Sequence, residues 1–307
     1  MRQGNKKIIV ILGPTSSGKT KLAVELANKF NGEIISADSR QVYRGMDIGT
    51  GKDLAEYKAG KKIIPYHLID IANPKARFNV AKYQKLAFKA IDGILRRGKL
   101  PILAGGSGLY LQAVVDNFQL SNSKPDLDLR KKLEKLGVSR LGAEIKKLSP
   151  KMAAKINDSD SKNKRRLIRY LEILLSDKNF KSGKAEEKYE FLIIGPACSR
   201  EALKKRIYKR LIYRLEKEKM VDEVKRLRGR GLSFKKLEAF GLEYKFIALY
   251  LQGELRYDET AEKLNIAINQ FAGRQLSWFR RWQRQGRKIN WVKNTGQAVK
   301  VVSGFLE

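Results

Sequence analysis

The chain has 307 residues, and its 65 Lys and Arg against 32 Asp and Glu give a formal net charge of +33 at pH 7. This excess favours a polyanionic partner, either nucleic acid or an anionic membrane surface, over a composition that is simply rich in Lys. One cysteine, Cys198, excludes an internal disulfide, and with a single histidine, His67, it leaves no Cys/His set for structural zinc. Because no apolar run has the length of a signal peptide or a bilayer span, we expect a cytoplasmic protein with no membrane partner. We also expect a monomer.

The amino end carries the motif around which the chain is organised. An apolar run from Ile8 to Leu12 precedes a glycine-rich loop, and an amphipathic helical pattern follows it. The loop fits G-x-x-x-x-G-K-[ST], the P-loop, in which glycines let backbone N–H groups turn toward phosphate oxygens at a helix start. Lys19 supplies a cation, and Thr20 offers a hydroxyl to a phosphate-bound Mg²⁺. The predicted phosphate-binding residues are Gly13, Pro14, Thr15, Ser16, Ser17, Gly18, Lys19 and Thr20.

Two later strand ends place further polar side chains beside this loop. Residues Glu33 to Ser36 are predicted to form a strand, after which Asp38 falls where open α/β sheets bind ligands; a helix N-cap formed with Ser39 is the equal alternative. A third strand, Leu100 to Leu103, ends in glycines and Ser107. Because a nucleotide hydrolase ordinarily ends such a strand with an acid, we expect the loop to hold a diphosphate or triphosphate without cleaving it by water.

These signals predict an α/β protein with a parallel, P-loop NTPase-like sheet, a helical insertion domain and a helical C-terminal region. The first part of the core is expected in residues 1–119, the insertion in 120–186, and a return strand with C-terminal helices in 187–307. His67 lies in an extended segment and is expected to be packed rather than catalytic. The other predicted elements are a loop at 41–57, the extended segment at 63–71, a strand at 190–195, and helices at 80–97, 200–228, 244–252, 257–264 and 269–285.

The predicted insertion is helical and strongly basic, and it begins with a polar linker at residues 121–125. With the global charge, a basic stripe on one of its helices favours contact with a nucleic-acid backbone over a merely solvated face. Within SKNKRRLIRYLEILL, the apolar helix face consists of Leu167, Ile168, Leu171, Leu174 and Leu175, and the basic stripe of Lys162, Arg165, Arg166 and Arg169.

Two sets of residues in the C-terminal part also indicate binding surfaces. Arg206, Arg210 and Arg214 are spaced four apart on one helix face, and one of them is expected to reach the phosphate site. The last helix alternates rings and guanidinium groups along one side, a surface on which RNA bases stack, although aromatics at this spacing also form cores. Its residues are Phe271, Arg274, Trp278 and Arg281.

Six segments taken together resemble the bacterial tRNA dimethylallyltransferases. They are, in chain order, GPTSSGKT, SADSRQVYRGMDIGTGK, YHLIDI, ILAGGSGLYLQAV, SKNKRRLIRYLEI and AGRQLSWFRRW. The likeness extends over nearly the whole chain. The second is the most specific, since ordinary P-loop kinases have no such sequence after the second strand. The resemblance implies that a dimethylallyl group passes from dimethylallyl diphosphate to N6 of the tRNA adenosine just 3′ of the anticodon, with release of diphosphate.

The same resemblance implies roles for individual residues. The P-loop grips the donor diphosphate, with Lys19 and a Thr20-bound Mg²⁺ stabilising the leaving group, and Asp38 is the general base. Ser107 stands where the family usually has Thr and binds the leaving group or orients the amine, while Arg210 matches a diphosphate-binding arginine. The implied contacts with the tRNA anticodon stem-loop are Asp38, Ser39, Arg40, Gln41, Arg130, Lys164, Arg165, Arg166 and Arg169.

The chain also departs from the family pattern, without altering the implied reacting centre. The departures are Tyr66 for His, Asp53 for Pro, Leu242 for Tyr, Asn269 for Arg and Gly273 for Lys. Three alternatives stay open. A prenyltransferase of free adenylate needs neither the +33 charge nor a basic insertion. A small-molecule or nucleoside P-loop kinase ordinarily has a strand-end acid, a part that Asp38 can fill. An RNA-binding protein with a relic P-loop has no need of Lys19, Thr20, Asp38 and Ser107 together.

Overall fold

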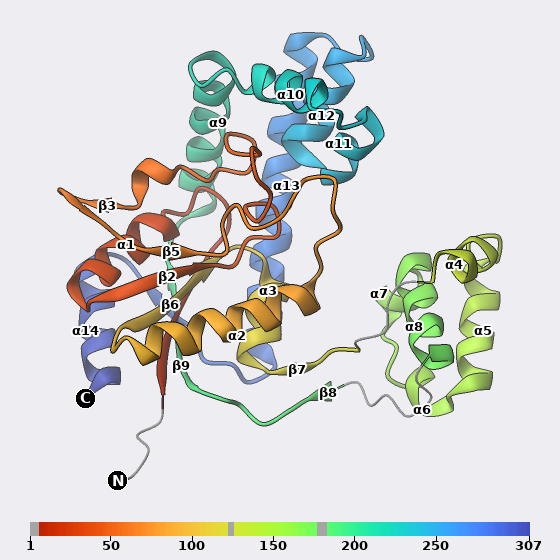
Figure 1. Ribbon diagram of the computed structural model, residues 1–307, viewed down its shortest axis with the longest axis horizontal. Coiled ribbons are helices and arrows are strands. Elements are labelled where there is room, and N and C mark those ends of the chain that lie inside the picture. Colours follow the sequence, from red (N-terminus) through yellow and green to blue (C-terminus); the bar gives the residue numbers. More distant parts are fainter. Residues whose placement is uncertain (1–5, 122–125, 177–182) are drawn as a thin grey trace. The chain divides into compact units, whose positions relative to one another are not determined.

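The computed structural model describes residues 6–121, 126–176 and 183–307, and the chain falls into two compact units (Figure 1). Unit 1 is formed by Met1–Asn117 and Glu187–Glu307, and unit 2 by Phe118–Glu186. Each is described below by itself. Of the predicted linker at 121–125, residues 122–125 lie outside the described part of the chain.

Unit 1 is built on a six-stranded parallel sheet with the order β10-β9-β1-β6-β2-β5. Its strands are β1 (Lys7–Leu12), β2 (Gly32–Ser36), β5 (Tyr66–His67), β6 (Leu100–Gly105), β9 (Glu190–Pro196) and β10 (Asn290–Val292). The α/β fold with a parallel P-loop core is therefore confirmed. Because β1, β6 and β2 are neighbours, the loops that follow them meet at one edge of the sheet.

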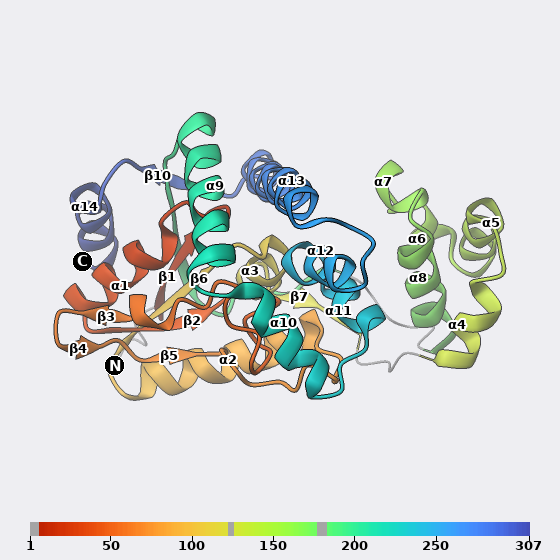
Figure 2. The same cartoon turned by 90° about the horizontal axis from the view of Figure 1, so that it is seen from above.

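Helices cover both faces of this sheet, as the unbroken apolar sequence of its central strand requires. Alternate residues of β1 point to opposite faces: Ile9 and Ile11 pack with α1 (Lys19–Lys29) and α14 (Thr295–Leu306). Ile8, Val10 and Leu12 pack with α2 (Val80–Arg96) and α3 (Gly108–Val115). Figure 2 shows α1 and α14 on one side of the sheet and α2 on the other.

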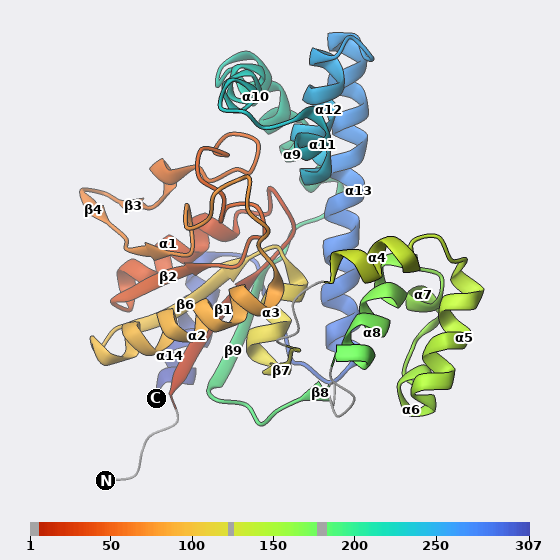
Figure 3. The same cartoon turned by 45° about the vertical axis from the view of Figure 1, so that its right-hand side comes forward.

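A third apolar cluster holds the helical C-terminal region together. It is formed by α9 (Arg200–Glu216), α10 (Met220–Gly229), α11 (Phe234–Phe240), α12 (Leu242–Leu251) and α13 (Tyr257–Arg284), with part of the loop after β2. The predicted spacing of four on α9 is confirmed, since Leu203, Ile207, Leu211 and Leu215 are all buried. Figure 3 shows α10, α11 and α12 grouped beside one end of the long helix α13.

Two predicted helix boundaries in this region were wrong. The single helix expected over 200–228 is two, because Lys219 adopts a left-handed conformation (φ 57°) that redirects the chain between α9 and α10. The two helices expected over 257–264 and 269–285 are one continuous helix, α13. Leu264, Ile268 and Ala272 continue a buried stripe across the predicted gap, so packing extends the helix through it.

The extended segment expected over 63–71 is mostly irregular. Only Lys62–Ile63 (β4), paired with β3 (Lys58–Ala59), and Tyr66–His67 (β5) are strands; Pro65 separates them, and Leu68 and Asp70 have left-handed backbones (φ 63° and 56°). His67 is half-buried, and its Nε2 lies 2.7 Å from Glu33 Oε2. It thus forms part of a polar contact at the sheet edge. A short 3₁₀ helix, η1 (Leu54–Glu56), precedes β3.

Unit 2 contains five helices in its described residues and a two-residue ladder between β7 (Phe118–Gln119) and β8 (Gly183–Lys184). The predicted apolar face of α8 packs into a separate core with Leu141 and Ile145, except that Leu175 is 47% exposed and was assigned to it wrongly. The helices are α4 (Leu127–Leu133), α5 (Val138–Leu148), α6 (Pro150–Ala153), α7 (Asp158–Ser161) and α8 (Lys164–Ser176).

None of the helices in the described ranges is both long enough and apolar enough to cross a lipid bilayer.

Candidate active site

A cavity of about 900 Å³ opens in unit 1 where the loops after β1, β2 and β6 converge. It collects most of the side chains predicted from the amino-terminal motifs, together with residues of α9, α12 and α13. Pro14 lines a second cavity instead, and Ser17 of the glycine loop is buried. The predicted residues that line it are Thr15, Ser16, Gly18, Lys19, Thr20, Asp38, Ser39, Arg40, Gln41, Ser107 and Arg210.

The glycine loop has the backbone geometry of a phosphate cradle. Ser16 and Gly18 adopt left-handed conformations (φ 59° and 88°), and α1 begins at the next residue, Lys19. The first N–H groups of α1 have no partners within the helix, and the helix dipole adds positive potential at the same place. This arrangement favours an anion with several oxygens, as the sequence motif predicts.

Lys19 provides a cation whose charge depends on pH. Its Nζ donates to the Pro14 carbonyl oxygen at 3.2 Å. Burial lowers the pKa of Lys19 to about 8, against the opposing attraction of Asp38, and nearby Arg210 lowers this pKa further. An anion bound in the loop would raise this pKa again, because opposite charge favours the ammonium form.

An arginine pair from α9 faces the glycine loop across the cavity. Arg210 and Arg214 both pair with the carboxylate of Asp53, at 3.1 and 3.0 Å. Burial and the neighbouring Arg214 lower the pKa of Arg210, and its Nε is buried without a hydrogen-bond partner. A buried donor left unpaired among cations indicates a position for an anionic ligand oxygen. The carboxylate of Asp53, a residue that departs from the family pattern, partly neutralises the two guanidinium groups.

Asp38 lines the cavity and caps a turn, whereas the helix N-cap considered for it is wrong, because the chain continues as a turn and the next helical element after β2 is η1. Its Oδ1 accepts the N–H groups of Arg40 at 2.8 Å and Gln41 at 3.3 Å. Ser107 contacts the same turn, because its Oγ accepts the Ser39 N–H at 3.0 Å. The second carboxylate oxygen of Asp38 has no hydrogen bond to a described residue.

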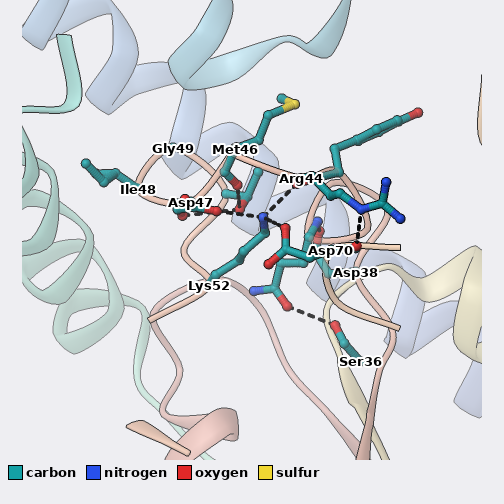
Figure 4. A network of polar contacts seen from close by, with 12 residues as sticks. Ser36, Asp38, Arg44, Met46, Asp47, Ile48, Gly49, Lys52 and Asp70 are labelled. Atoms are coloured by element: carbon teal, nitrogen blue, oxygen red, sulfur yellow. Dashed lines mark hydrogen bonds and ion pairs between the residues drawn. The ribbon is translucent and has the colours of Figure 1, made fainter. Parts of the chain in front are cut away.

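The loop after β2 is held by two buried charges that the sequence analysis did not select. Lys52 has a fully buried amine that donates to the Tyr43 carbonyl oxygen at 2.6 Å and pairs with Asp47 and Asp70 (Figure 4). Gln41 then donates to the Gly51 carbonyl oxygen at 2.9 Å. A lysine inside a glycine-rich loop gives no pattern that distinguishes it from a solvated one.

Glu223 of α10 fixes the far side of this loop. Its buried carboxylate accepts the N–H groups of Asp47, Ile48 and Gly49 at 2.8, 2.7 and 3.1 Å, and the Tyr244 hydroxyl at 2.8 Å. A carboxylate with four donors is strongly held in place. Its sequence neighbourhood, an ordinary charged helix, gave no signal of this role.

The aromatic and basic side of α13 reaches the cavity. Phe271, Arg274 and Trp278 line it, and the Arg281 guanidinium lies 4.2 Å from the centre of the Trp278 ring. Arg40 lies 5.5 Å from the Phe271 ring and pairs with Glu243 at 3.3 Å. These rings and guanidinium groups form a surface suited to stacking a base.

In unit 2, the predicted RNA contacts divide by their partners. Arg130 and Arg169 pair with the buried Glu172, and Arg166 pairs with Asp160. Lys164 and Arg165, at the start of α8, have no ion pair with a described residue, and Arg165 is exposed. The latter two are therefore the cations of this helix that a phosphate can meet without displacing a carboxylate.

The side chains of the cavity that could bind a divalent cation offer oxygen ligands. Thr20 lines the cavity together with Asp53 and Glu56. Burial raises the pKa of Glu56, and the negative charge of the neighbouring Asp53 raises it further. No group of three or more metal-binding side chains occurs in the described ranges. The residues therefore fit a Mg²⁺ held mainly by phosphate oxygens and the Thr20 hydroxyl, as in other P-loops.

Comparisons with known proteins identify the family of the chain. The IPP transferase family matches residues 41–282. The chain is 46% identical over 290 residues to "tRNA dimethylallyltransferase 1" of Syntrophus aciditrophicus, covering 94% of each chain. It resembles the crystal structure of the tRNA isopentenylpyrophosphate transferase from Bacillus halodurans with a TM-score of 0.67 and 36% identity, covering 98% of this chain and 95% of the other.

A second solved structure, described as a eukaryotic dimethylallyltransferase acting on tRNA, matches with a TM-score of 0.70 and 26% identity, over 89% of this chain and 69% of the other. The family match covers more than half of the chain, and the similarity to the Syntrophus aciditrophicus protein extends over nearly its full length. The chain belongs to the IPP transferase family.

Proposed function

We propose that the chain transfers a dimethylallyl group from dimethylallyl diphosphate to N6 of the tRNA adenosine just 3′ of the anticodon. The supporting observation is a single cavity that holds a phosphate cradle and the carboxylate of Asp38, on strands separated only by β6. The family membership favours this function over a free-adenylate prenyltransferase, a P-loop kinase or a relic P-loop protein.

In the proposed reaction the diphosphate occupies the glycine loop, between Lys19 and Arg210. The allylic C–O bond breaks, and the diphosphate leaves with its electron pair. Charge accumulates on its oxygens in the transition state, where Lys19, Arg210 and the first N–H groups of α1 stabilise it. A Mg²⁺ on Thr20 would supply further neutralisation of that charge.

The adenosine amine supplies the nucleophile. As N6 forms its bond to the allylic carbon, a proton leaves N6 for the free oxygen of Asp38. The turn that Asp38 caps fixes the direction of this oxygen, and Ser107 fixes the neighbouring Ser39 backbone. The target adenosine has to leave the anticodon-loop stack, and the ring of Phe271 or Trp278 receives it.

Unit 2 is proposed to bind the anticodon stem through α8. Replacing Lys164 and Arg165 by Ala is expected to weaken tRNA binding about tenfold. The negative slope of log K against log salt is expected to become shallower by about 1.5, because two phosphate contacts are lost. Fluorescence anisotropy with labelled tRNA between 50 and 300 mM salt, roughly the range in which such slopes are read, measures both.

The matched control replaces Lys146 and Lys147, two exposed lysines on α5 of the same unit that no predicted RNA contact includes. The control removes the same number of charges and is expected to change the slope by less than half as much. An equal change in both double variants would mean that only net charge matters and would exclude a specific α8 contact.

Mass spectrometry of nucleosides tests the proposed function itself. The protein is incubated with Mg²⁺, with either unmodified tRNA or free adenylate as the acceptor, and with either dimethylallyl diphosphate or ATP as the donor. We expect adenosine to gain one five-carbon unit only with the first donor and only in tRNA. Modification of free adenylate instead, or phosphate transfer from ATP, would overturn the proposal.

A further inference from the structure

Gln275, a buried residue of α13, bridges two of the loops that form the cavity. Its Oε1 accepts the Thr15 N–H at 2.9 Å, and its Nε2 donates to the Gly106 carbonyl oxygen at 2.9 Å. Its exposed fraction is 7%. One amide thus satisfies a donor of the glycine loop and an acceptor of the loop after β6, using both ends of its dipole.

The bridge continues to the general base. Ser107, next to Gly106, accepts the Ser39 N–H at 3.0 Å, and Ser39 follows Asp38 in the chain. A path of hydrogen bonds and backbone connections therefore runs from the loop that holds Lys19, through Gln275 and Ser107, to the turn capped by Asp38. The two loops at the ends of this path are those proposed to hold the leaving group and to accept the proton.

Close packing leaves this path little freedom. A Cβ atom at Gly106 would lie 2.3 Å from Gln275 Nε2, and one at Gly108 would lie 2.4 Å from Trp278 Cδ1. Trp278 is itself held by a hydrogen bond from its Nε1 to Gln112 Oε1 at 3.1 Å. These two glycines therefore let α13 approach the segment after β6, and the amide of Gln275 occupies the space that the absent Cβ of Gly106 leaves.

We infer that Gln275 is a positioning residue for prenyl transfer, which sets the distance between the diphosphate cradle and the proton acceptor. The inference rests on the proposed function. Displacing the reacting groups by about 1 Å costs rates of the order of 100-fold, so a lost bridge acts on the chemical step more than on binding. Its position in α13 also couples the cavity to the helix that carries Phe271 and Trp278.

Two variants test this in single-turnover experiments with saturating donor and tRNA. Gln275→Met keeps the side-chain length but removes both hydrogen bonds, and we expect the rate constant to fall about 10- to 100-fold with tRNA affinity within threefold of wild type. Gln275→Glu keeps the acceptor for Thr15 and, when protonated, regains a donor for Gly106. Its rate relative to wild type is therefore expected to rise as pH is lowered from 8 to about 5.5, since a buried carboxyl has a raised pKa.

Gln270→Met serves as the control, because Gln270 lies on the exposed side of the same helix; it is expected to react at the wild-type rate. A purely structural role would lower the melting temperature of Gln275→Met while leaving the rate per folded molecule unchanged, and would overturn the inference. So would a pH-independent ratio for Gln275→Glu. If wild type forms no prenylated adenosine, the proposed function fails first, and the two failures are thereby distinguished.

Discussion

Replacing Asp38 by Asn is expected to lower the rate of prenyl transfer about 10³-fold, because the amide retains the turn but cannot accept the N6 proton. Its Oδ1 still accepts the Arg40 N–H, a contact of 2.8 Å in the wild type, so the loop geometry is preserved. Single-turnover rates with saturating donor measure the chemical step, and tRNA affinity is expected to stay within threefold.

Asp38→Ala gives the comparison, since it removes the cap as well as the base. We expect it to be no faster than Asp38→Asn. Asp258→Asn is the matched control, because Asp258 is an exposed carboxylate that pairs with Arg256 at the start of α13; it is expected to leave the rate unchanged. If Asp38→Asn reacts within tenfold of wild type, another group accepts the proton.

Replacing Lys19 by Met is expected to lower the rate about 100-fold, through lost stabilisation of the departing diphosphate. The wild type should also bind dimethylallyl diphosphate more weakly above pH 8. Its free Lys19, with a pKa of about 8, is progressively neutral there, whereas the bound diphosphate requires the ammonium form. Donor binding near pH 8.5 therefore takes up a proton, while at pH 6.5 Lys19 is already charged in the free protein.

Titration calorimetry in buffers of different ionisation enthalpy measures this uptake. Lys19→Met is expected to show none, and Lys19→Arg keeps its charge over the whole range, so its donor affinity should not depend on pH between 7 and 9. Wild-type donor affinity that stays constant over the same range would mean that Lys19 does not contact the diphosphate.

The positions of Lys19, Asp38 and Ser107 at the cavity were predictable because each follows a short local pattern. The P-loop motif fixes its own backbone, and the strands before Asp38 and Ser107 are short apolar runs that end in turn residues. Parallel strands place their carboxyl ends at one edge, so the three loops had to converge if the strands were neighbours. The order β1-β6-β2 made them so.

The supporting groups were not predictable from local pattern. Gln275, Glu223 and Lys52 contact residues between 5 and 260 positions away, and none of them stands in a spacing that marks a role. The predicted helix boundaries were wrong for a related reason. The packing of Ile268 extends α13 through an expected break. Lys219 separates α9 from α10 by a left-handed backbone conformation, and no glycine or proline marks that position in the sequence.

The sequence by itself therefore determined the parallel P-loop sheet, the backbone of the glycine loop and the place of Asp38 at the end of the second strand, since these depend on residues close together in the chain. The tertiary structure decided which cations are free to meet a ligand. Arg130, Arg166 and Arg169 are engaged by carboxylates of unit 2, whereas Lys164 and Arg165 are not. Charge pairing across a fold depends on which side chains come within a few ångströms of one another, and only packing sets that distance.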